Sequence, residues 1–446
     1  NNAGNNFTGA VSTTGANVTL NDISAIILGA STVTGNLVVT NAGNVTQTGV
    51  LAVTGTTTLT PGAAFDVTLN SANQFGGAVS VTTATNVSIT DANGLALGAI
   101  TASGTLGATA TLGDITNTGA LLITGAATFT ANDVGANISV DNAANNFGST
   151  VAFAGAGGLA NVTVVDLSAF DIQALTLTGA LSVTADGVVT DSGILNIGGT
   201  TYVIARGFNV TLDQLGTLSG LVSVNTSGIS GIGGDIHLTS TASFSVQSLV
   251  ADGWDPSTAR AGFDGGNITL DAGASNSVTL TVGGLITTIG GDANGEFAGG
   301  NGGNVTFLVN AIIGGGTTID LSGGTGTPNG TVGTLTFFST VIDGTSTFYA
   351  SVDLGDVVVI ANSDVTVFGT LTLRTVIGGG FNLILSVEDF DLTGNVNNLA
   401  SLTIQNRVSS GAINLMSTAV GAVNISQTEW DLIQSSVNSV VLGSLV

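Results

Sequence analysis

Hydrophobic and polar residues alternate along most of this chain in short segments of about five residues. Examples are residues 17–20 (NVTL), 36–40 (NLVVT) and 86–90 (NVSIT). This alternation is typical of a β-strand that buries one face. Glycine, asparagine or aspartate interrupts it about every six to ten residues, so no strand is long enough to be stable within its own turn. We therefore expect each strand to pair with the turns before and after it.

One repeat of about 70 residues recurs three times within residues 1–204. Phe7, Phe75 and Phe147 mark equivalent positions in the three copies, 68 (75 − 7) and 72 (147 − 75) residues apart. Repeats of this kind, built from short alternating segments, predict a stacked solenoid in which each unit buries its neighbour. With roughly 20 to 25 residues per turn, each repeat would form about three turns of a parallel β-helix.

The pattern divides the chain into three zones. They are a regular β-solenoid over residues 1–204, a β-solenoid with extruded glycine-rich loops over 205–340, and a regular β-solenoid over 341–446. In the middle zone, polar glycine-rich stretches at 251–264 and 290–301 separate strand starts of the form GGD or GGN. Residues 428–437 (TEWDLIQSSV) show partial helical spacing, and both a short helix and a further strand remain open there.

Composition excludes several classes of protein. The chain has 67 Gly, no Cys and no Lys, and four Arg stand against 28 acidic residues, giving a net charge of −24. Such a charge makes binding to a phosphate backbone unfavourable, so we expect no nucleic-acid partner. Without cysteine there are no disulfides or thiolate metal sites. The mean hydropathy of +0.54 indicates a buried core. Every apolar run is too short to span a membrane.

Several phrases resemble the repeats of large filamentous-haemagglutinin-like exoproteins of Gram-negative bacteria. These are NQFGGAVSV at 73–81, GVLAVTGTTTLT at 49–60, FDVTLNSANQF at 65–75 and GGNITLDA at 265–272. The resemblance implies a right-handed parallel β-helix that is secreted by a two-partner or autotransporter route. It also implies a role as an adhesin or matrix fibre, outside the cell or on the outer-membrane surface.

Few residues offer catalytic chemistry. The single histidine, His237, alternates with Ile236 and Leu238, so we expect an outward strand residue. Asp353 with Asp356, and Glu388 with Asp389 and Asp391, are the tight acidic groups, and turns or solvated faces explain them. We therefore expect no enzyme. A carbohydrate-active β-helix enzyme is the alternative, and a groove lined by several carboxylates would favour it.

Two weak candidate sites lie in the glycine-rich zone. Asp292, Asn294 and Glu296 alternate as at the start of a calcium loop, but Gly303 stands where the closing carboxylate is needed. This excludes an EF-hand and leaves loosely bound calcium as the cofactor to test.

Trp254, with Asp255 and Phe263, lies in the longest polar stretch. An exposed aromatic ring there could stack on a glycan or dock a protein, or it could cover the apolar side of the solenoid.

Asparagine recurs at the start of strands in Asn-x-Ser/Thr triplets. The positions are Asn17, Asn44, Asn86, Asn137, Asn161, Asn209, Asn267, Asn304 and Asn424. They match the glycosylation pattern, but their place at strand starts favours side-chain ladders between successive turns. If so, Val18, Val87 and Val162 point inward.

These observations favour a secreted, non-catalytic stalk or fibre. A self-assembling fibre or sheath subunit is the alternative, because solenoid ends are open strand edges and charged residues are only 7% of the chain. We expect self-association, end to end or laterally, with residues 439–446 covered by neighbouring protein. Cell-surface glycans or proteins are the other candidate partners.

Overall fold

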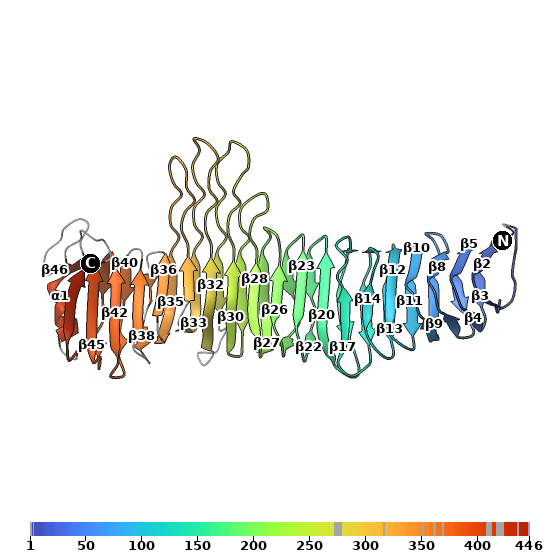
Figure 1. The fold of residues 1–446 in the computed structure, drawn as a ribbon, viewed down its shortest axis with the longest axis horizontal. Coiled ribbons are helices and arrows are strands. Elements are labelled where there is room, and N and C mark those ends of the chain that lie inside the picture. The colour runs from blue at the N-terminus through green and yellow to red at the C-terminus, as the bar shows by residue number, and fades with distance from the viewer. Residues whose placement is uncertain are drawn as a thin grey trace. The chain divides into compact units, whose positions relative to one another are not determined.

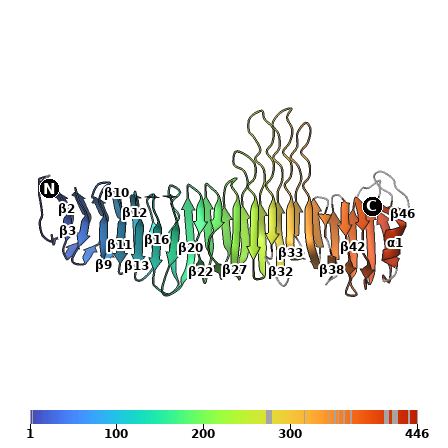
Figure 2. The same cartoon turned by 180° about the vertical axis from the view of Figure 1, so that it is seen from behind.

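The computed structural model describes residues 2, 4–271, 279–314, 317–343, 345–349, 352–354, 356–359, 363–367, 370–406, 413–415, 423–434 and 437–444. Two compact units, Asn1–Val203 and Ile204–Val446, make up the chain. Both are β-solenoids, and together they contain about 17 turns of parallel strands (Figures 1 and 2). The all-β solenoid expected from the sequence is therefore confirmed. In the described part of the chain, no helix is long and apolar enough to cross a membrane.

Unit 1 has three faces, each a stack of parallel strands from successive turns. Face A contains β2 (Val18–Asp22), β5 (Leu37–Asn41), β8 (Thr57–Thr60), β10 (Val79–Ala84), the end of β12 (Leu95–Ala102), β15 (Leu121–Ile123) and β18 (Asn146–Phe147). Face B contains β3 (Ile26–Leu28), β6 (Val45–Gln47), the start of β9 (Val67–Phe75), β11 (Val87–Asp91), β13 (Leu106–Ala110), β16 (Ala127–Ala131) and β19 (Val151–Ala154).

Face C of unit 1 is built in the same way. It contains β1 (Thr14–Gly15), β4 (Ser31–Val33), β7 (Leu51–Val53), the end of β9, the start of β12, β14 (Ile115–Asn117), β17 (Ala136–Val140), β20 (Leu159–Asp166) and β23 (Leu181–Ala185). The last turns add β21 (Phe170–Ile172), β22 (Leu175–Leu177), β24 (Val189–Asp191), β25 (Leu195–Ile197) and β26 (Thr201–Ile204). Alternate residues of these strands point inward and form one continuous apolar core.

Each repeat of unit 1 makes about three and one third turns. Val18 stacks through Leu37 and Thr57 to Val79, which is three turns in 61 residues (79 − 18). The next repeat starts 8 residues later at Val87 (87 − 79), one strand further along, and Val87 therefore lies on face B. Val162, which starts the third repeat, lies on face C. Each repeat is thus about one strand longer than the expected three turns. For this reason, equivalent residues lie on a different face in each copy.

Unit 2 continues the solenoid pattern with three stacks of its own. The first contains β27 (Val210–Leu218), β29 (Ile236–Ser240), β31 (Ile268–Asp271), the starts of β33 (Val305–Gly314) and β35 (Leu335–Asp343), β37 (Val352–Asp353), β40 (Thr370–Leu373) and β43 (Asp389–Leu392). The second contains β28 (Leu221–Asn225), the starts of β30 (Phe244–Val250) and β32 (Thr279–Thr287), the ends of β33 and β35, β38 (Asp356–Val359), β41 (Val376–Ile377) and β44 (Val396–Asn397).

The third stack of unit 2 ends at the last strand of the chain. It contains the ends of β28, β30 and β32, β34 (Thr317–Asp320), β36 (Thr345–Tyr349), β39 (Ser363–Val367), β42 (Asn382–Val387), β45 (Ser401–Asn406) and β48 (Val440–Ser444). Beside them lie a two-stranded sheet of β46 (Ile413–Leu415) and β47 (Val423–Ile425), and the helix α1 (Gln427–Gln434). The segment in which helix and strand were both open is therefore mainly helical.

Asparagine and aspartate form a hydrogen-bonded ladder at each corner of unit 1. At the corner before face A, Asn17 Oδ1 accepts the N–H of Asn36 at 2.9 Å, and Asn36 Oδ1 accepts the N–H of Thr56. The other two ladders run Asn44–Asp66–Asn86–Thr105 and Asp114–Asn137–Asn161–Ala180, and unit 2 has Asn209–Asp235–Asn267–Asn304–Thr334. The predicted ladder is confirmed at these asparagines.

The inward register predicted from the strand starts holds for all three residues, although they are not equally buried. Val87 and Val162 are buried, as expected, at 1% and 0% exposure. Val18 lies in register with the buried Leu37 and is half-buried; among the described strands, β2 pairs only with β5.

A buried aspartate closes the first strand of each repeat. Asp91 is the last residue of β11, where its oxygens accept the N–H groups of Phe75 at 2.8 Å and Asn93 at 2.9 Å. Asp166 binds the N–H of Phe147 in the same way. These are the phenylalanines that mark the repeat in the sequence.

The environment shifts the pKa of these aspartates in two directions. Burial raises the pKa of Asp91 and Asp166, since the backbone N–H groups only partly offset the loss of hydration. Burial also acts on Asp22, the equivalent residue of the first repeat. There the N–H groups of Phe7 and Ser24 outweigh it and lower the pKa.

Candidate functional site

Four glycine-rich loops project from the same corner of unit 2, between its third and first stacks (Figure 1). They span residues 226–235, 251–267, 288–304 and 321–334, and are called loops 1 to 4 in chain order. Loops 2 and 3 contain the two stretches predicted from the sequence, and loops 1 and 4 were missed. Each loop has an outgoing and a return arm, and we call the four together the loop bundle.

Backbone hydrogen bonds join the arms of the loop bundle in two directions. Successive return arms are linked where the N–H groups of Gly299 and Gly302 donate to Pro328 and Thr331, at 3.0 and 2.8 Å. Within loop 3, the Gly300 N–H on the return arm donates to the outgoing arm at 2.9 Å. Donors to one neighbour are three residues apart, which is the period of a polyproline II helix. The loop bundle is therefore a layered array of extended three-fold arms.

Close packing of the arms explains the glycines of the loop bundle. A Cβ atom on Gly330 would lie 1.7 Å from the carbonyl oxygen of Gly300, and one on Gly262 would lie 1.8 Å from that of Gly291. No side chain fits at such distances. Glycine is therefore required here because the backbones of neighbouring arms are in direct contact.

Acidic side chains extend the corner ladders into the loop bundle. Asp255 accepts the N–H of Asp292 at 2.6 Å, and Asp292 accepts the N–H of Thr325 at 2.7 Å. Asp252 accepts the N–H of Ile289 and the hydroxyl of Thr287. Burial, and more weakly the nearby charges of Asp320 and Asp255, raise the pKa of Asp252.

The predicted binding residues Trp254 and Phe263 lie on the two arms of loop 2 and face each other. Their ring centroids are 5.8 Å apart, and the guanidinium carbon of Arg260 lies 4.8 Å from the centre of the Phe263 ring. Both aromatic rings are half-buried, whereas Asp255 is exposed. The cluster closes loop 2 by aromatic and cation–π contact, and its exposed edges are available to a partner.

The predicted calcium residues Asp292, Asn294 and Glu296 all lie in loop 3. Asp292 belongs to the ladder, while the backbone of Asn294 pairs with that of Arg260 by two bonds of 3.0 Å. Glu296 is exposed in the turn that follows. In the described part of the chain, no three His, Cys, Asp or Glu side chains are grouped so as to hold a metal ion.

His237 points outward from β29, as predicted. The neighbouring Ile236 and Leu238 are buried, and the Nε2 atom of His237 lies 3.2 Å from the hydroxyl of Thr239. Its side chain thus belongs to a half-exposed polar surface. The side chains of Asp353 and Asp356 are not among those that the structure describes.

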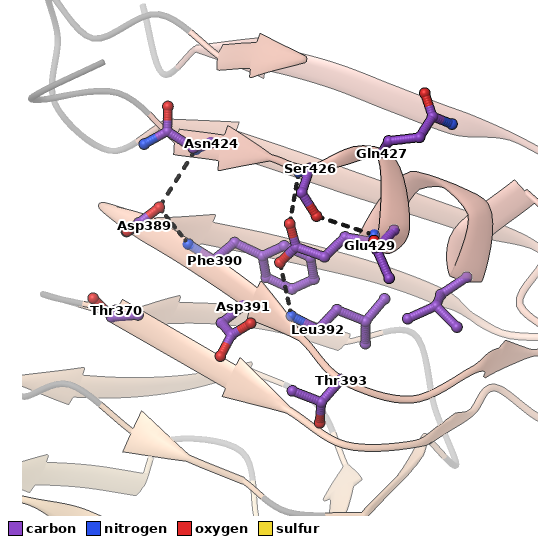
Figure 3. A pocket seen from close by; sticks show the side chains of 12 residues that line it. Thr370, Asp389, Phe390, Asp391, Leu392, Thr393, Asn424, Ser426, Gln427 and Glu429 are labelled. Atoms are coloured by element: carbon purple, nitrogen blue, oxygen red, sulfur yellow. Dashed lines mark hydrogen bonds between the residues drawn. The ribbon is translucent and has the colours of Figure 1, made fainter. Parts of the chain in front are cut away.

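An open cavity of about 1110 Å³ lies between β43 and α1 (Figure 3). Its lining includes the carboxylates of Asp389, Asp391 and Glu429. Asp389 Oδ1 accepts the N–H of Phe390 at 3.0 Å and that of Asn424 at 3.4 Å. A groove lined by several carboxylates is the feature that would favour the enzyme alternative. The hydrogen bonds of these carboxylates show whether they are engaged in holding the structure together.

Both carboxylate oxygens of Glu429 are held by backbone donors. Oε2 accepts the N–H of Ser426 at 2.7 Å, and the Ser426 hydroxyl accepts the N–H of Glu429, which is a capping box at the start of α1. Oε1 accepts the N–H of Leu392 on β43 at 2.9 Å. Glu429 therefore fastens the helix to a strand edge (Figure 3). This role was not predicted, although the Ser426-x-x-Glu429 spacing in the sequence is its signal.

Comparison with known proteins identifies the repeat but no relative of established role. A family model described as repeats of unknown function (DUF5649) matches residues 15–82, 84–154 and 159–225. No curated protein and no solved structure matches the chain. The three matches follow the repeats seen in the sequence, and the fold stacks them in parallel turns. The chain is a β-solenoid repeat protein.

Proposed function

We propose that this chain is a secreted, non-catalytic β-solenoid that acts as an adhesin stalk or extracellular matrix fibre. Its place would be the exterior or outer-membrane surface of a Gram-negative bacterium. The partners we propose are cell-surface glycans or proteins, met mainly by the loop bundle.

The observation that carries the proposal is the contrast between the repeats and the loop bundle. The repeats of unit 1 are made of ladders and core, and their equivalent positions move from face to face. The loop bundle instead carries its exposed apolar side chains on successive loops that leave one corner of unit 2. Ile229 and Ile232 are 62% and 61% exposed, and Phe297 is 44% exposed. Exposed apolar groups gathered on neighbouring loops are typical of contact surfaces.

Adhesion of protein-coated beads to cells tests this proposal. We expect the intact chain to hold beads to a cell layer above the level of albumin-coated beads, and the Phe297→Ala variant to hold fewer. Leu122→Ala is the matched control, because Leu122 is 43% exposed but lies in unit 1. Adhesion at the albumin level, or an equal loss in both variants, would contradict the proposal.

A self-assembling fibre is the second candidate, favoured by exposed apolar side chains along unit 1. They are Ile23, Val50, Leu112, Leu122, Val134, Leu167, Val188 and Ile194. In unit 2, Val441 on β48 is 48% exposed, and among the described strands β48 pairs only with β45. Residues 445 and 446 of the predicted contact segment lie outside the described residues. Sedimentation velocity that shows assemblies growing with concentration would support a fibre, and a stable monomer would exclude it.

A further inference from the structure

The return arms of the loop bundle show how one extended strand docks on another. Gly299 and Gly302 of loop 3 donate their N–H groups to the carbonyls of Pro328 and Thr331 in loop 4. One of the two acceptors is a proline, which has no N–H of its own to satisfy. Carbonyls at every third residue of a three-fold strand thus meet a row of N–H donors with the same spacing.

Loop 4 carries the same row of donors without acceptors. Gly300 and Gly330 are equivalent, since each N–H donates from a return arm to the outgoing arm of its own loop. Asn329 and Val332 therefore correspond to Gly299 and Gly302. Neither donates its backbone N–H to any residue that the structure describes. Both residues are exposed, Val332 at 53%.

Side chains at these two positions stop the bundle from simply adding a fifth loop. A Cβ on Gly299 would lie 2.0 Å from the carbonyl oxygen of Gly324, and one on Gly302 would lie 1.9 Å from that of Leu321. In loop 4 the corresponding positions hold Asn329 and Val332, so a further outgoing arm cannot pack there. The position of a further return arm, which faces the two N–H groups, is not blocked in this way.

We propose that residues 328–334 are a docking site for an extended proline- and glycine-rich peptide in the polyproline II conformation. The chain itself provides the precedent, because Pro328 and Thr331 occupy the equivalent position on loop 3. Proline-rich peptides hold this conformation before binding and therefore lose little entropy. Their carbonyls recur about every 9 Å along one side, which matches donors three residues apart. The side chain of Val332 adds an apolar contact.

This proposal rests on the proposed role of the loop bundle as a contact surface, and it names the partner. Another site in the bundle competes with it. Proline-rich peptides also dock on aromatic rings, and Trp254 with Phe263 could receive one. The experiment must therefore separate the two places.

Fluorescence anisotropy of a labelled (Gly-Pro-Pro)₃ peptide with the full chain tests the site. A flexible Gly-Ser peptide of equal length is the ligand control. Val332→Pro removes the N–H donor but is compatible with the three-fold strand, whereas Val332→Ala keeps the donor. We expect Val332→Pro to weaken binding by about five-fold, as for one hydrogen bond, and Val332→Ala by less than about two-fold.

Three outcomes would overturn the proposal. They are no binding of the Gly-Pro-Pro peptide, equal binding by wild type and Val332→Pro, and loss of binding in Trp254→Ala alone. If Val332→Pro disturbs the fold, hydrogen exchange of the wild type decides, because the peptide must slow the amides of Asn329 and Val332. If Val332→Pro leaves the adhesion of beads unchanged, residues 328–334 are not the adhesive site, but the proposed adhesive function of the chain still stands.

Discussion

Replacing Asn145 by alanine should destabilise unit 1 by removing a side chain that joins three strands. Asn145 is fully buried. Its Oδ1 atom accepts the N–H of Leu121 at 2.9 Å and the side-chain amide of Asn117 at 2.8 Å. Its Nδ2 atom donates to the carbonyl of Val140 at 2.9 Å. No other described side chain is placed to replace these bonds.

The expected loss of stability follows from the groups left behind. Alanine would leave the Leu121 N–H buried without a partner, at about 1–3 kcal/mol. The Val140 carbonyl keeps its place in the parallel ladder, where Val140 is in register with Val164 of β20. The amide of Asn117 keeps its bond to the carbonyl of Gly119. The free energy of unfolding should therefore fall by about 1–3 kcal/mol. A water molecule entering the vacated space would bring the loss toward the lower value.

Asn146→Ala provides the matched control, because Asn146 is the next residue and is exposed. Surface substitutions of this kind change stability by about 0.5 kcal/mol or less. Guanidinium unfolding followed by far-UV circular dichroism compares the two variants. Because repeat proteins can unfold in parts, hydrogen exchange at Leu121 provides a second, local measurement. Equal unfolding curves and equal exchange for both variants would refute the reasoning.

Three further predictions concern pH, the loop bundle and the helix. Burial raises the pKa of Asp91 and Asp166, so between the ordinary pKa and the raised one the folded state binds more protons than the unfolded chain. The melting temperature should therefore rise as the pH falls through that window. A melting temperature that falls steadily with the pH would contradict this. Gly330→Ala should speed hydrogen exchange in loops 3 and 4, whereas Gly231→Ala, where a Cβ meets nothing within 4 Å, should not; equal exchange would contradict the packing. Glu429→Ala should lower stability by about 1–3 kcal/mol and raise exchange at the start of α1, and an unchanged helix would exclude the capping role.

The sequence was most informative where one strand follows the next without interruption. Alternation places Val87 and Val162 correctly inside, because a strand with one apolar face has a single register that buries it. The strand-start asparagines were equally clear, since one side-chain oxygen per turn reaches the next backbone N–H. Alternation also gives the inward direction of Val18, but not its half-buried state, because the depth of burial depends on the turns packed beside the strand.

The number of turns per repeat could not be predicted from strand patterns alone. From Val18 to Val79 the successive turns take 19 (37 − 18), 20 (57 − 37) and 22 (79 − 57) residues. Corners of different length have the same glycine and asparagine signals, so the pattern does not say where one turn closes. Only the pairing of Val87 with Val67 shows that the repeat has moved on by one face.

The loop bundle was only half predicted, for a different physical reason. Its arms lack the two-residue alternation of strands and instead follow the three-residue period of Gly330 and Gly333. Glycine at every third residue is the signal that could have revealed loop 4. Glu429 was also missed, because its partner Leu392 lies 37 residues away in sequence.

The extra third of a turn in each repeat limits how a partner can bind unit 1. Val18, Val87 and Val162 start the three repeats on three different faces. A partner that lies along one face therefore meets the start of a repeat only once in three copies, and it gains little avidity from the repetition. A partner that recognises all three copies has to surround the solenoid. In the loop bundle, by contrast, four successive loops leave the same corner, so equivalent groups lie side by side. Repetition can strengthen binding there, and for this reason our proposal assigns partner contacts to the loop bundle rather than to unit 1.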